Sequence, residues 1–212
     1  MIFPVAPGQK VWLPQRGGRL SPVLRHNIRN AIFKSPANRR MCHAKACFST
    51  EINAVQSNEW RKLLAMGGVC YRLADISPSE IAELYAMLSR LHSGWADRLT
   101  HRRRTAALLG SVPEMLTGNV LFHAGAPCTL DLVLCGESDR NIYFDVANGG
   151  HHPGASGFSP AGLMMWAGIR DAQERCRKVD KTMIMLTGAC REEWGFKNVL
   201  SDVLPTGYSV CV

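Results

Sequence analysis

The clearest pattern of apolar and polar positions lies between Asn119 and Gly188. Breaks containing Gly125 and Gly136 separate three short runs of apolar or alternating residues, which cover 119–124, 127–135 and 141–146. Short runs between turn residues predict antiparallel strands that pair in sequence order. A helical stretch then leads to another apolar run, 182–186. Because a helix crosses between them, we expect this run to lie parallel beside the third strand.

Helical periodicity and capping residues mark the other elements. Ser77 and Glu80 have the spacing of a capping box, and apolar residues follow them at helical period. Ser159 and Pro160 start another helix, whose inward face carries Leu163, Trp166 and Ile169. Further helices are expected at 21–34, 58–66, 99–109 and 191–198, and further strands at 41–48, 69–74 and 208–212.

The order of these elements from Val69 is strand, two helices, three strands, helix, strand, helix, strand. It predicts an α+β (α/β) protein with a mixed central sheet, an antiparallel meander and flanking helices. This order resembles the GNAT acyltransferase fold, and the resemblance implies that acyl-coenzyme A lies between splayed central strands. We expect a GNAT-like domain over 69–212. Residues 1–68 are expected to be a basic linker or helical segment, the remnant of a preceding GNAT-like half.

Composition narrows the class of protein. Hydrophobic residues make up 46% of the chain, yet no run approaches the roughly 18 apolar residues of a membrane-spanning helix. The first residues lack the basic start and long apolar segment of a signal peptide. We therefore expect a cytoplasmic protein, at most attached to the inner membrane from that side. Eight cysteines occur without a CxxC pair, which favours small buried thiols in a reducing compartment over a zinc site.

Positive charge is concentrated near the N-terminus. The formal net charge is +8, and residues 1–50 contain nine Lys or Arg and no Asp or Glu. A second basic cluster covers 98–104. Such clusters attract nucleic acid, acidic lipid surfaces or anionic substrates, and they also occur as simple solvated faces.

The segment 148–157 is rich in glycine and is expected to be a loop that precedes the helix at Ser159. A helix N-terminus offers backbone N–H groups to an anion, which makes this a candidate cofactor site. Its expected contacts are Asn148, Gly149, Gly150, Ser159, Ala161 and Gly162. Pro160 removes one N–H from this set. A tight turn explains the paired glycines as well as a ligand does.

Three side chains are candidates for catalysis. Asp145 could accept a proton from an attacking amine or hydroxyl, or it could cap a turn at Asn148 and Gly149. His151, with His152 beside it, could be a general base. Adjacent loop side chains rarely converge on one ion, so no metal is expected. Lys197 could contact an anionic acyl carrier or phosphate, or form a structural ion pair.

A closer resemblance is carried by short stretches of sequence. They are Gly118–Phe122, Pro127–Cys128, Asp131–Val133, Glu137–Ser138, Tyr143–Val146, Asn148–Gly150, Ser159–Pro160 and Lys181–Ile184. In these stretches the chain resembles the Mig family, macrophage-inducible bacterial proteins linked to antimicrobial-peptide resistance. The resemblance implies action at the cytoplasmic membrane against cationic peptides. A wider kinship with Fem-type aminoacyltransferases suggests transfer chemistry, with acyl-coenzyme A or aminoacyl-tRNA as the donor.

The same resemblance suggests partners. An anionic membrane surface or an envelope precursor is the first expectation. Family members carry a further N-terminal half that this chain mostly lacks, so a partner chain could supply it. Two other functions compete with transfer: a degenerate GNAT-like module that binds a ligand without catalysis, and a nucleic-acid-binding regulator that uses the basic N-terminal region.

Overall fold

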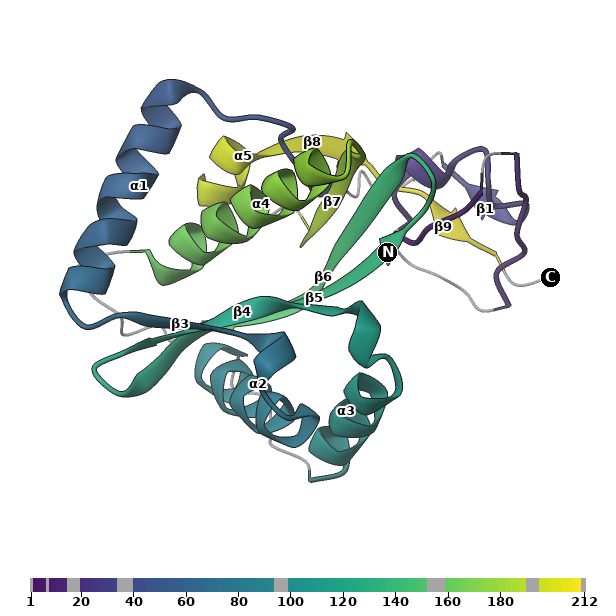
Figure 1. Cartoon of the computed structure of the whole chain (residues 1–212). Helices are drawn as coiled ribbons and strands as arrows, with labels where there is room; N and C mark the ends of the chain where they lie inside the picture. The colour runs from purple at the N-terminus through teal and green to yellow at the C-terminus, as the bar shows by residue number, and fades with distance from the viewer. Residues whose placement is uncertain are drawn as a thin grey trace. The chain divides into compact units, whose positions relative to one another are not determined.

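The computed structural model of the chain describes residues 2–6, 8–14, 20–33, 40–93, 99–151, 159–189 and 195–210. The helices are α1 (Thr50–Ala65), α2 (Pro78–Ser93), α3 (Leu99–Ser111), α4 (Pro160–Lys178) and α5 (Gly195–Leu200) (Figure 1). Short 3₁₀ helices cover Pro22–Leu24, Leu73–Asp75 and Pro113–Met115. The strands are β1 (Ala31–Ile32), β2 (Arg40–Ala44), β3 (Val69–Arg72), β4 (Leu116–His123), β5 (Ala126–Glu137), β6 (Asn141–His151), β7 (Thr182–Ala189), β8 (Ser201–Pro205) and β9 (Tyr208–Ser209).

Seven strands form one mixed sheet in the order β3-β4-β5-β6-β7-β2-β8, and β1 pairs with β9 separately. The predicted meander is confirmed: β4 and β5 pair antiparallel, and the short connection 138–140 joins β5 to its neighbour β6. The predicted parallel pair is also confirmed, with a register from Asn141 opposite Thr182 to Asp145 opposite Leu186. This parallel pair and the element order from β3 to β8 give the GNAT-like α+β fold that the sequence predicted.

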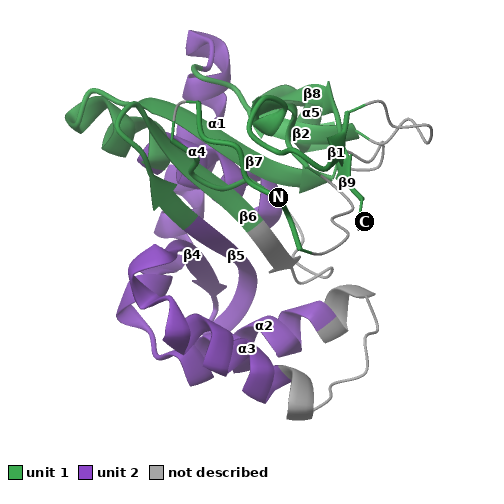
Figure 2. Cartoon of the chain, turned by 90° about the vertical axis from the view of Figure 1, so that its right-hand side faces the viewer, with its two compact units in different colours: residues 1–47, 135–146, 172–212 green, residues 48–134, 147–171 purple. Residues whose placement is uncertain are grey.

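The chain divides into two compact units, coloured separately in Figure 2. Unit 1 contains residues 1–47, 135–146 and 172–212, and unit 2 contains residues 48–134 and 147–171. The division crosses β5, β6 and α4 along the chain.

In unit 2, neighbouring residues of β4 face two different sets of helices. Successive side chains of a strand point to opposite faces of the sheet. Val120 is fully buried against Ile81 and Leu88 of α2, together with Leu109 of α3. Leu121 faces the other way, where the buried side chains of α1 and α4 pack against it, namely Leu63, Leu163 and Met164. Each face of the β4 region therefore has its own helical layer.

In unit 1, the same alternation places Tyr143 and Phe144 on opposite faces of β6. Tyr143 packs with Ile2, Met41 and Leu186. The guanidinium of Arg175, on α4, lies 5.9 Å from the centre of the Phe144 ring. A second cluster in unit 1 joins the N-terminal segment to the 3₁₀ helix and consists of Val5, Leu20, Leu24 and Ile28.

Local signals in the sequence set several boundaries correctly. The Glu80 carboxylate accepts hydrogen bonds from the backbone N–H and hydroxyl of Ser77, and Ser77 Oγ accepts one from the Glu80 N–H. This is the predicted capping box, directly before α2. Gly67, just after α1, has a φ of +84°. This is the left-handed backbone conformation that commonly ends a helix and that glycine adopts most easily. α1 begins at Thr50, well before the predicted start at residue 58.

The helix predicted at 21–34 is wrong. Ser21 does cap a helix, but that helix is only the 3₁₀ segment Pro22–Leu24. Tertiary contacts hold the rest in an irregular path: the Asn30 side chain accepts from Leu13 N and donates to the carbonyls of Leu13 and Val210. Side-chain bonds to distant backbone compete with helical hydrogen bonds, so the apolar period at Leu24 and Ile28 reflects burial without a helix.

Two further expectations need correction. Asn148, Gly149, Gly150 and His151 were expected in a loop, yet β6 continues through them to His151; residues 152–157 of that expected loop lie outside the described chain. Gly136 was expected at a break, but β5 continues to Glu137. A Cβ at position 136 would lie 2.8 Å from Cδ of Pro4, so this glycine admits a close approach of the N-terminal segment.

Candidate functional site

The predicted site residues belong to both compact units. Asp145 and Lys197 lie in unit 1, whereas residues 148–151, Ser159, Ala161 and Gly162 lie in unit 2.

Asp145 stands opposite Leu186 at the end of the parallel β6–β7 ladder. Its half-buried carboxylate accepts a hydrogen bond from the backbone N–H of Ile2, at 3.1 Å between N and Oδ2. The alternative role, capping a turn at Asn148 and Gly149, is wrong because both residues continue β6. An ionised carboxylate can accept a proton, and Asp145 stands at the end of the parallel pair, so this position is compatible with a general base.

Lys197 lies on α5, and its Nζ donates a hydrogen bond of 2.7 Å to the carbonyl oxygen of Thr187 on β7. The next residue, Gly188, has a φ of +90°, and a Cβ there would lie 3.6 Å from Lys197 Nζ. The ammonium group is thus fixed against the end of β7, on the strand that pairs with Asp145. Both catalytic candidates of unit 1 therefore flank the same parallel pair.

The N-terminus of α4 offers few donors to an anion. Pro160 has no N–H, and the N–H of Gly162 donates to the Ser159 hydroxyl at 3.4 Å. Of the first three helical residues, this leaves only the N–H of Ala161 without an acceptor among the described residues. The start of α4 therefore fits a diphosphate group poorly. Among the described residues, no group of three or more His, Cys, Asp or Glu side chains is placed to hold a metal ion.

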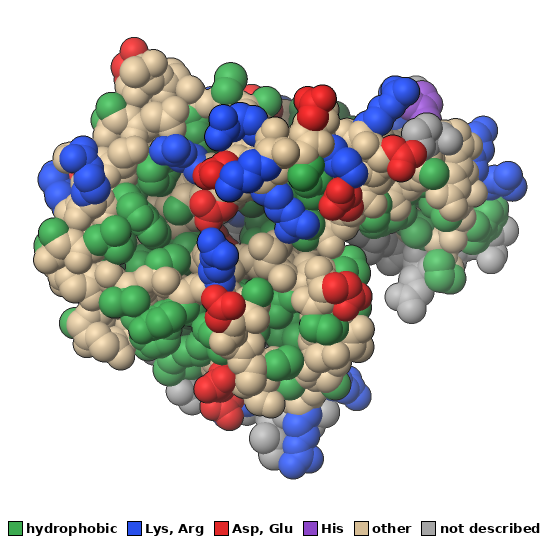
Figure 3. Space-filling model, in the orientation of Figure 1, with side chains coloured by type: hydrophobic (Ala, Val, Ile, Leu, Met, Phe, Trp, Pro, Cys, Tyr) green, Lys and Arg blue, Asp and Glu red, His purple; other side chains and the backbone are tan. Residues whose placement is uncertain are grey.

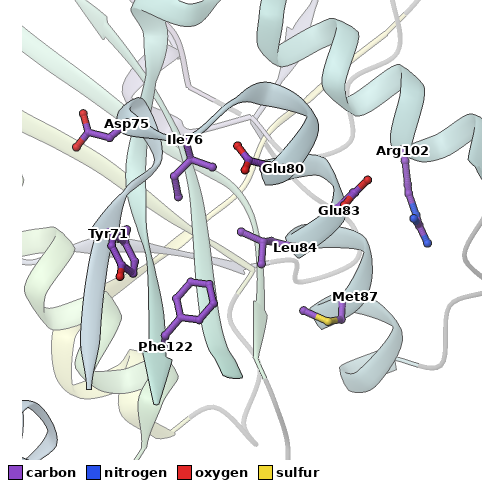
Figure 4. A pocket seen from close by; sticks show the side chains of 9 residues that line it. All are labelled: Tyr71, Asp75, Ile76, Glu80, Glu83, Leu84, Met87, Arg102 and Phe122. Carbon is purple, nitrogen blue, oxygen red and sulfur yellow. The ribbon is translucent and has the colours of Figure 1, made fainter. Parts of the chain in front are cut away.

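A pocket in unit 2 was not predicted from the sequence (Figure 4). It has a volume of about 620 Å³, and its lining residues are Tyr71, Asp75, Ile76, Glu80, Glu83, Leu84, Met87, Arg102 and Phe122. Four of them come from α2 at the helical spacing that places side chains on one face: Glu80, Glu83, Leu84 and Met87. That spacing is visible in the sequence and could have indicated this face. The strand residues Tyr71 and Phe122 join it only through folding.

A second pocket, of about 460 Å³, lies in unit 1 and has a basic lining. Lys10, His26 and Arg140 contribute to it, together with the neutral polar side chains of Asn27, Ser138 and Asn141. The hairpin turn beside it is fixed by Lys181, whose Nζ contacts both the Glu137 carboxylate and the Ser138 carbonyl. The hydrogen bond and the charge of Lys181 lower the pKa of Glu137, which supports a structural role for this exposed carboxylate.

Folding also brings together a serine and a histidine that the sequence did not connect. Ser21 Oγ lies 3.1 Å from His43 Nε2, and Asp202 is paired with His43 in the β2–β8 register. Ser21 has no exposed surface, and its oxygen also accepts from Val23 N. Burial lowers the pKa of His43, which favours its neutral form. Because no substrate can reach the hydroxyl, this pair is structural.

The described cysteines match the expectation of buried thiols in most cases. Cys42, Cys128, Cys135 and Cys176 are buried, Cys70 is half-buried and Cys47 is exposed. Burial raises the pKa of Cys70 to about 11, and the charges of Asp171 and Asp131 act in the same direction. A raised pKa suppresses the reactive thiolate, so Cys70 is not a candidate nucleophile.

Comparison with known proteins gives the family. The family model described as Mig-14 matches residues 1–208, nearly the whole chain. The chain belongs to the Mig-14 family. For this Mig-14 protein, a comparison with curated proteins finds no match.

Several solved structures resemble this Mig-14 chain at low sequence identity. The C-terminal domain of a protein designated lysylphosphatidylglycerol synthetase, from Agrobacterium fabrum, is 12% identical with a TM-score of 0.49, and the match covers 88% of this chain and 69% of that one. A GCN5-related N-acetyltransferase-like protein from Streptococcus suis is 11% identical with a TM-score of 0.47, covering 85% and 62%. A predicted acetyltransferase from Clostridium acetobutylicum, solved with acetyl-CoA, is 9% identical with a TM-score of 0.39, covering 57% and 81%.

The surface of this Mig-14 protein mixes charges of both signs in the view of Figure 3. Among the described residues drawn there, Lys and Arg side chains are interspersed with Asp and Glu. Within the described part of the chain, no helix is both long enough and apolar enough to cross a membrane.

Proposed function

We propose that this Mig-14 protein protects a bacterium against cationic antimicrobial peptides by transferring an acyl or aminoacyl group to a component of the cell envelope. The observation that carries the proposal is the parallel β6–β7 pair, with Asp145 at the end of its ladder. In the GNAT fold, which the chain resembles, that pair flanks the donor. The family resemblance supplies the link to peptide resistance.

The residues of this chain have distinct roles in the proposed transfer. Asp145 takes the proton from the attacking amine or hydroxyl of the acceptor, and the Ile2 N–H keeps its carboxylate in position. Lys197, held by the Thr187 carbonyl, places a positive charge beside β7, where it attracts the anionic part of a donor. The donor is an acyl-coenzyme A or an aminoacyl-tRNA. The bond from its acyl carbon to the coenzyme A sulfur or the tRNA ribose oxygen breaks as the bond to the acceptor forms, and the leaving thiol or hydroxyl takes up a proton.

A donor screen tests the proposal directly. The purified chain is heated with acetyl-coenzyme A, longer acyl-coenzymes A and aminoacyl-tRNA, and unfolding is followed in each case. A donor present at 100 times its dissociation constant stabilises the folded state by about 2.7 kcal/mol. Stabilisation by one donor class, followed by transfer to an amine or hydroxyl acceptor, is the expected result. No stabilisation by any donor would overturn the proposal.

A second candidate function, ligand binding without transfer, is favoured by the start of α4. The proline at 160 and the capped Gly162 N–H leave little for a diphosphate to bind. In this alternative the GNAT-like fold is kept while the donor site is lost. Peptide resistance that survives in an Asp145→Asn variant would support binding over transfer.

A further inference from the structure

The pocket in unit 2 combines an apolar floor with an acidic rim. The floor is formed by Tyr71, Ile76, Leu84, Met87 and Phe122, which come from β3, the segment after it, α2 and β4 (Figure 4). Its volume of about 620 Å³ falls within the range of small-molecule sites. The pocket is therefore large enough for one small ligand.

The floor presents aromatic surface to solvent from a fixed position. Tyr71 is 51% exposed although it stands in a strand, and its ring meets Phe122 edge to face, with centroids 5.7 Å apart and an interplanar angle of 87°. The rest of the floor is anchored in the core of unit 2. Its partly buried side chains pack against the buried residues of α2, α3 and β4, and they are Ile76, Leu84 and Phe122. Exposed apolar surface gathered in a concavity is typical of a binding site.

The rim carries three carboxylates, Asp75, Glu80 and Glu83, and one guanidinium, Arg102. The whole chain has a formal net charge of +8, so the negative charge of the rim is opposite in sign to that of the chain. Glu80 is oriented by two described hydrogen bonds, which its Oε2 accepts from the backbone N–H and the hydroxyl of Ser77. Those bonds lower the pKa of Glu80 and keep it ionised.

We propose that this pocket binds a small amphiphilic amine, with its apolar body on the aromatic floor and its ammonium group at the acidic rim. Carboxylates attract the ammonium group and repel an anion. The exposed face of Tyr71 adds a cation–π attraction to the same group. A neutral amphiphile gains only the apolar contacts with the floor. An anionic amphiphile is in addition repelled by the carboxylates of the rim. The site is independent of the proposed transfer reaction, because Asp145 and Lys197 do not line it.

Three probes with one apolar body and different head groups test the proposal: octylamine, octanol and octanoate. Binding to the full chain is measured at pH 7 by calorimetry and by the fluorescence of tyrosine and tryptophan. We expect octylamine to bind most tightly and octanoate least. Octanoate binding as tightly as octylamine would overturn the proposal.

Two variants and a control locate the site. Glu83→Gln removes one rim charge from an exposed side chain, and we expect it to weaken octylamine about two- to fivefold while leaving octanol unchanged. Tyr71→Ala removes part of the floor and is expected to weaken both octylamine and octanol. The control is Glu114→Gln, an exposed carboxylate of the same unit that does not line the pocket. Equal effects of Glu83→Gln and Glu114→Gln, or no effect of Tyr71→Ala, would also overturn it.

Discussion

The hydrogen bond between the Ile2 N–H and Asp145 makes an asparagine at 145 informative. Its amide oxygen can accept the same N–H but cannot take a proton from an acceptor nucleophile. If Asp145 is the base, Asp145→Asn lowers the transfer rate roughly 100-fold or more while the melting temperature stays near that of the parent. Rates with the preferred donor and a melting curve measure this. Full activity in the folded variant would exclude Asp145 as the base.

Gly118 shows what one backbone position demands. It has a φ of +109°, and a Cβ there would collide with the carbonyl oxygen of Asp131 on the paired strand β5. Gly118→Ala is therefore expected to lower the free energy of unfolding by at least about 2 kcal/mol. Gly168→Ala is the control, because Gly168 lies in α4 and, apart from its neighbours and the adjacent helical backbone, no atom lies within 4 Å of its Cβ position. That change should be neutral or stabilising, as helix propensity predicts. Denaturant titration compares the two.

Cysteine reactivity tests the burial and the raised pKa of Cys70. The pKa of Cys70 is raised to about 11, so at pH 8 only on the order of one thiol in a thousand is a thiolate. Exposed Cys47 should therefore be alkylated by iodoacetamide at least about tenfold faster than Cys70 in the folded protein. Peptide mapping after timed alkylation measures both. The difference should vanish in denaturant, and equal rates without denaturant would contradict the described burial of Cys70.

Among the elements, α2 depends most clearly on a signal that the sequence shows. Ser77 and Glu80 cap it reciprocally, and the same glutamate forms part of the pocket rim. Ser77→Ala removes the capping hydroxyl and should lower the free energy of unfolding by about 1 kcal/mol at pH 7. Because Glu80 also loses the Ser77 hydroxyl and keeps only the backbone N–H of residue 77 as a described partner, its carboxylate is less well oriented and octylamine binding should weaken in the same variant. Urea unfolding and calorimetry check the two effects separately.

The pH dependence of this cap has a definite sign. Hydrogen bonds from Ser77 lower the pKa of Glu80 below 4.5 in the folded chain. The carboxylate therefore adds stability above pH 4.5, and this contribution is lost as the pH falls through the lower folded value. The stability difference between the parent and Glu80→Gln should be largest near neutral pH and shrink below pH 4.5. A difference that grows on acidification would contradict the capping role.

Prediction of the elements from sequence succeeded where local signals decide and failed where distant contacts decide. The capping box at Ser77 and the alternating runs of the meander need only neighbouring residues, so they were visible. The path of residues 21–33 depends on Asn30 bonding to Leu13 and Val210, which lie far away in sequence. The pocket was missed for the same reason, since Tyr71 and Phe122 meet the α2 face only through strand pairing.

At the scale of the whole molecule, positive charge raises the question of an anionic partner. The chain has a formal net charge of +8, and nine of its basic residues lie in the first 50 positions without an acidic one. Arg25, Arg29 and Arg40 are exposed there, and Lys10 is exposed in the lining of the basic pocket. Basic side chains near an anionic bilayer each contribute about 1 kcal/mol, and salt screens this attraction. We therefore propose that the protein associates with anionic membranes through this segment.

Two charge-matched double variants test that association. Arg25→Glu with Arg29→Glu changes the basic segment, whereas Arg61→Glu with Arg177→Glu removes the same charge from exposed positions of α1 and α4 that lie outside both basic clusters. Flotation with phosphatidylglycerol vesicles at low and high salt should show parent binding that salt abolishes. The first variant should bind roughly 30-fold or more weakly, because two attractive contacts of about 1 kcal/mol each are lost, and the second should bind nearly as the parent does. Equal loss of binding in both variants would show that net charge alone causes the attraction. Preference for duplex DNA over vesicles at physiological salt would favour a nucleic-acid partner instead.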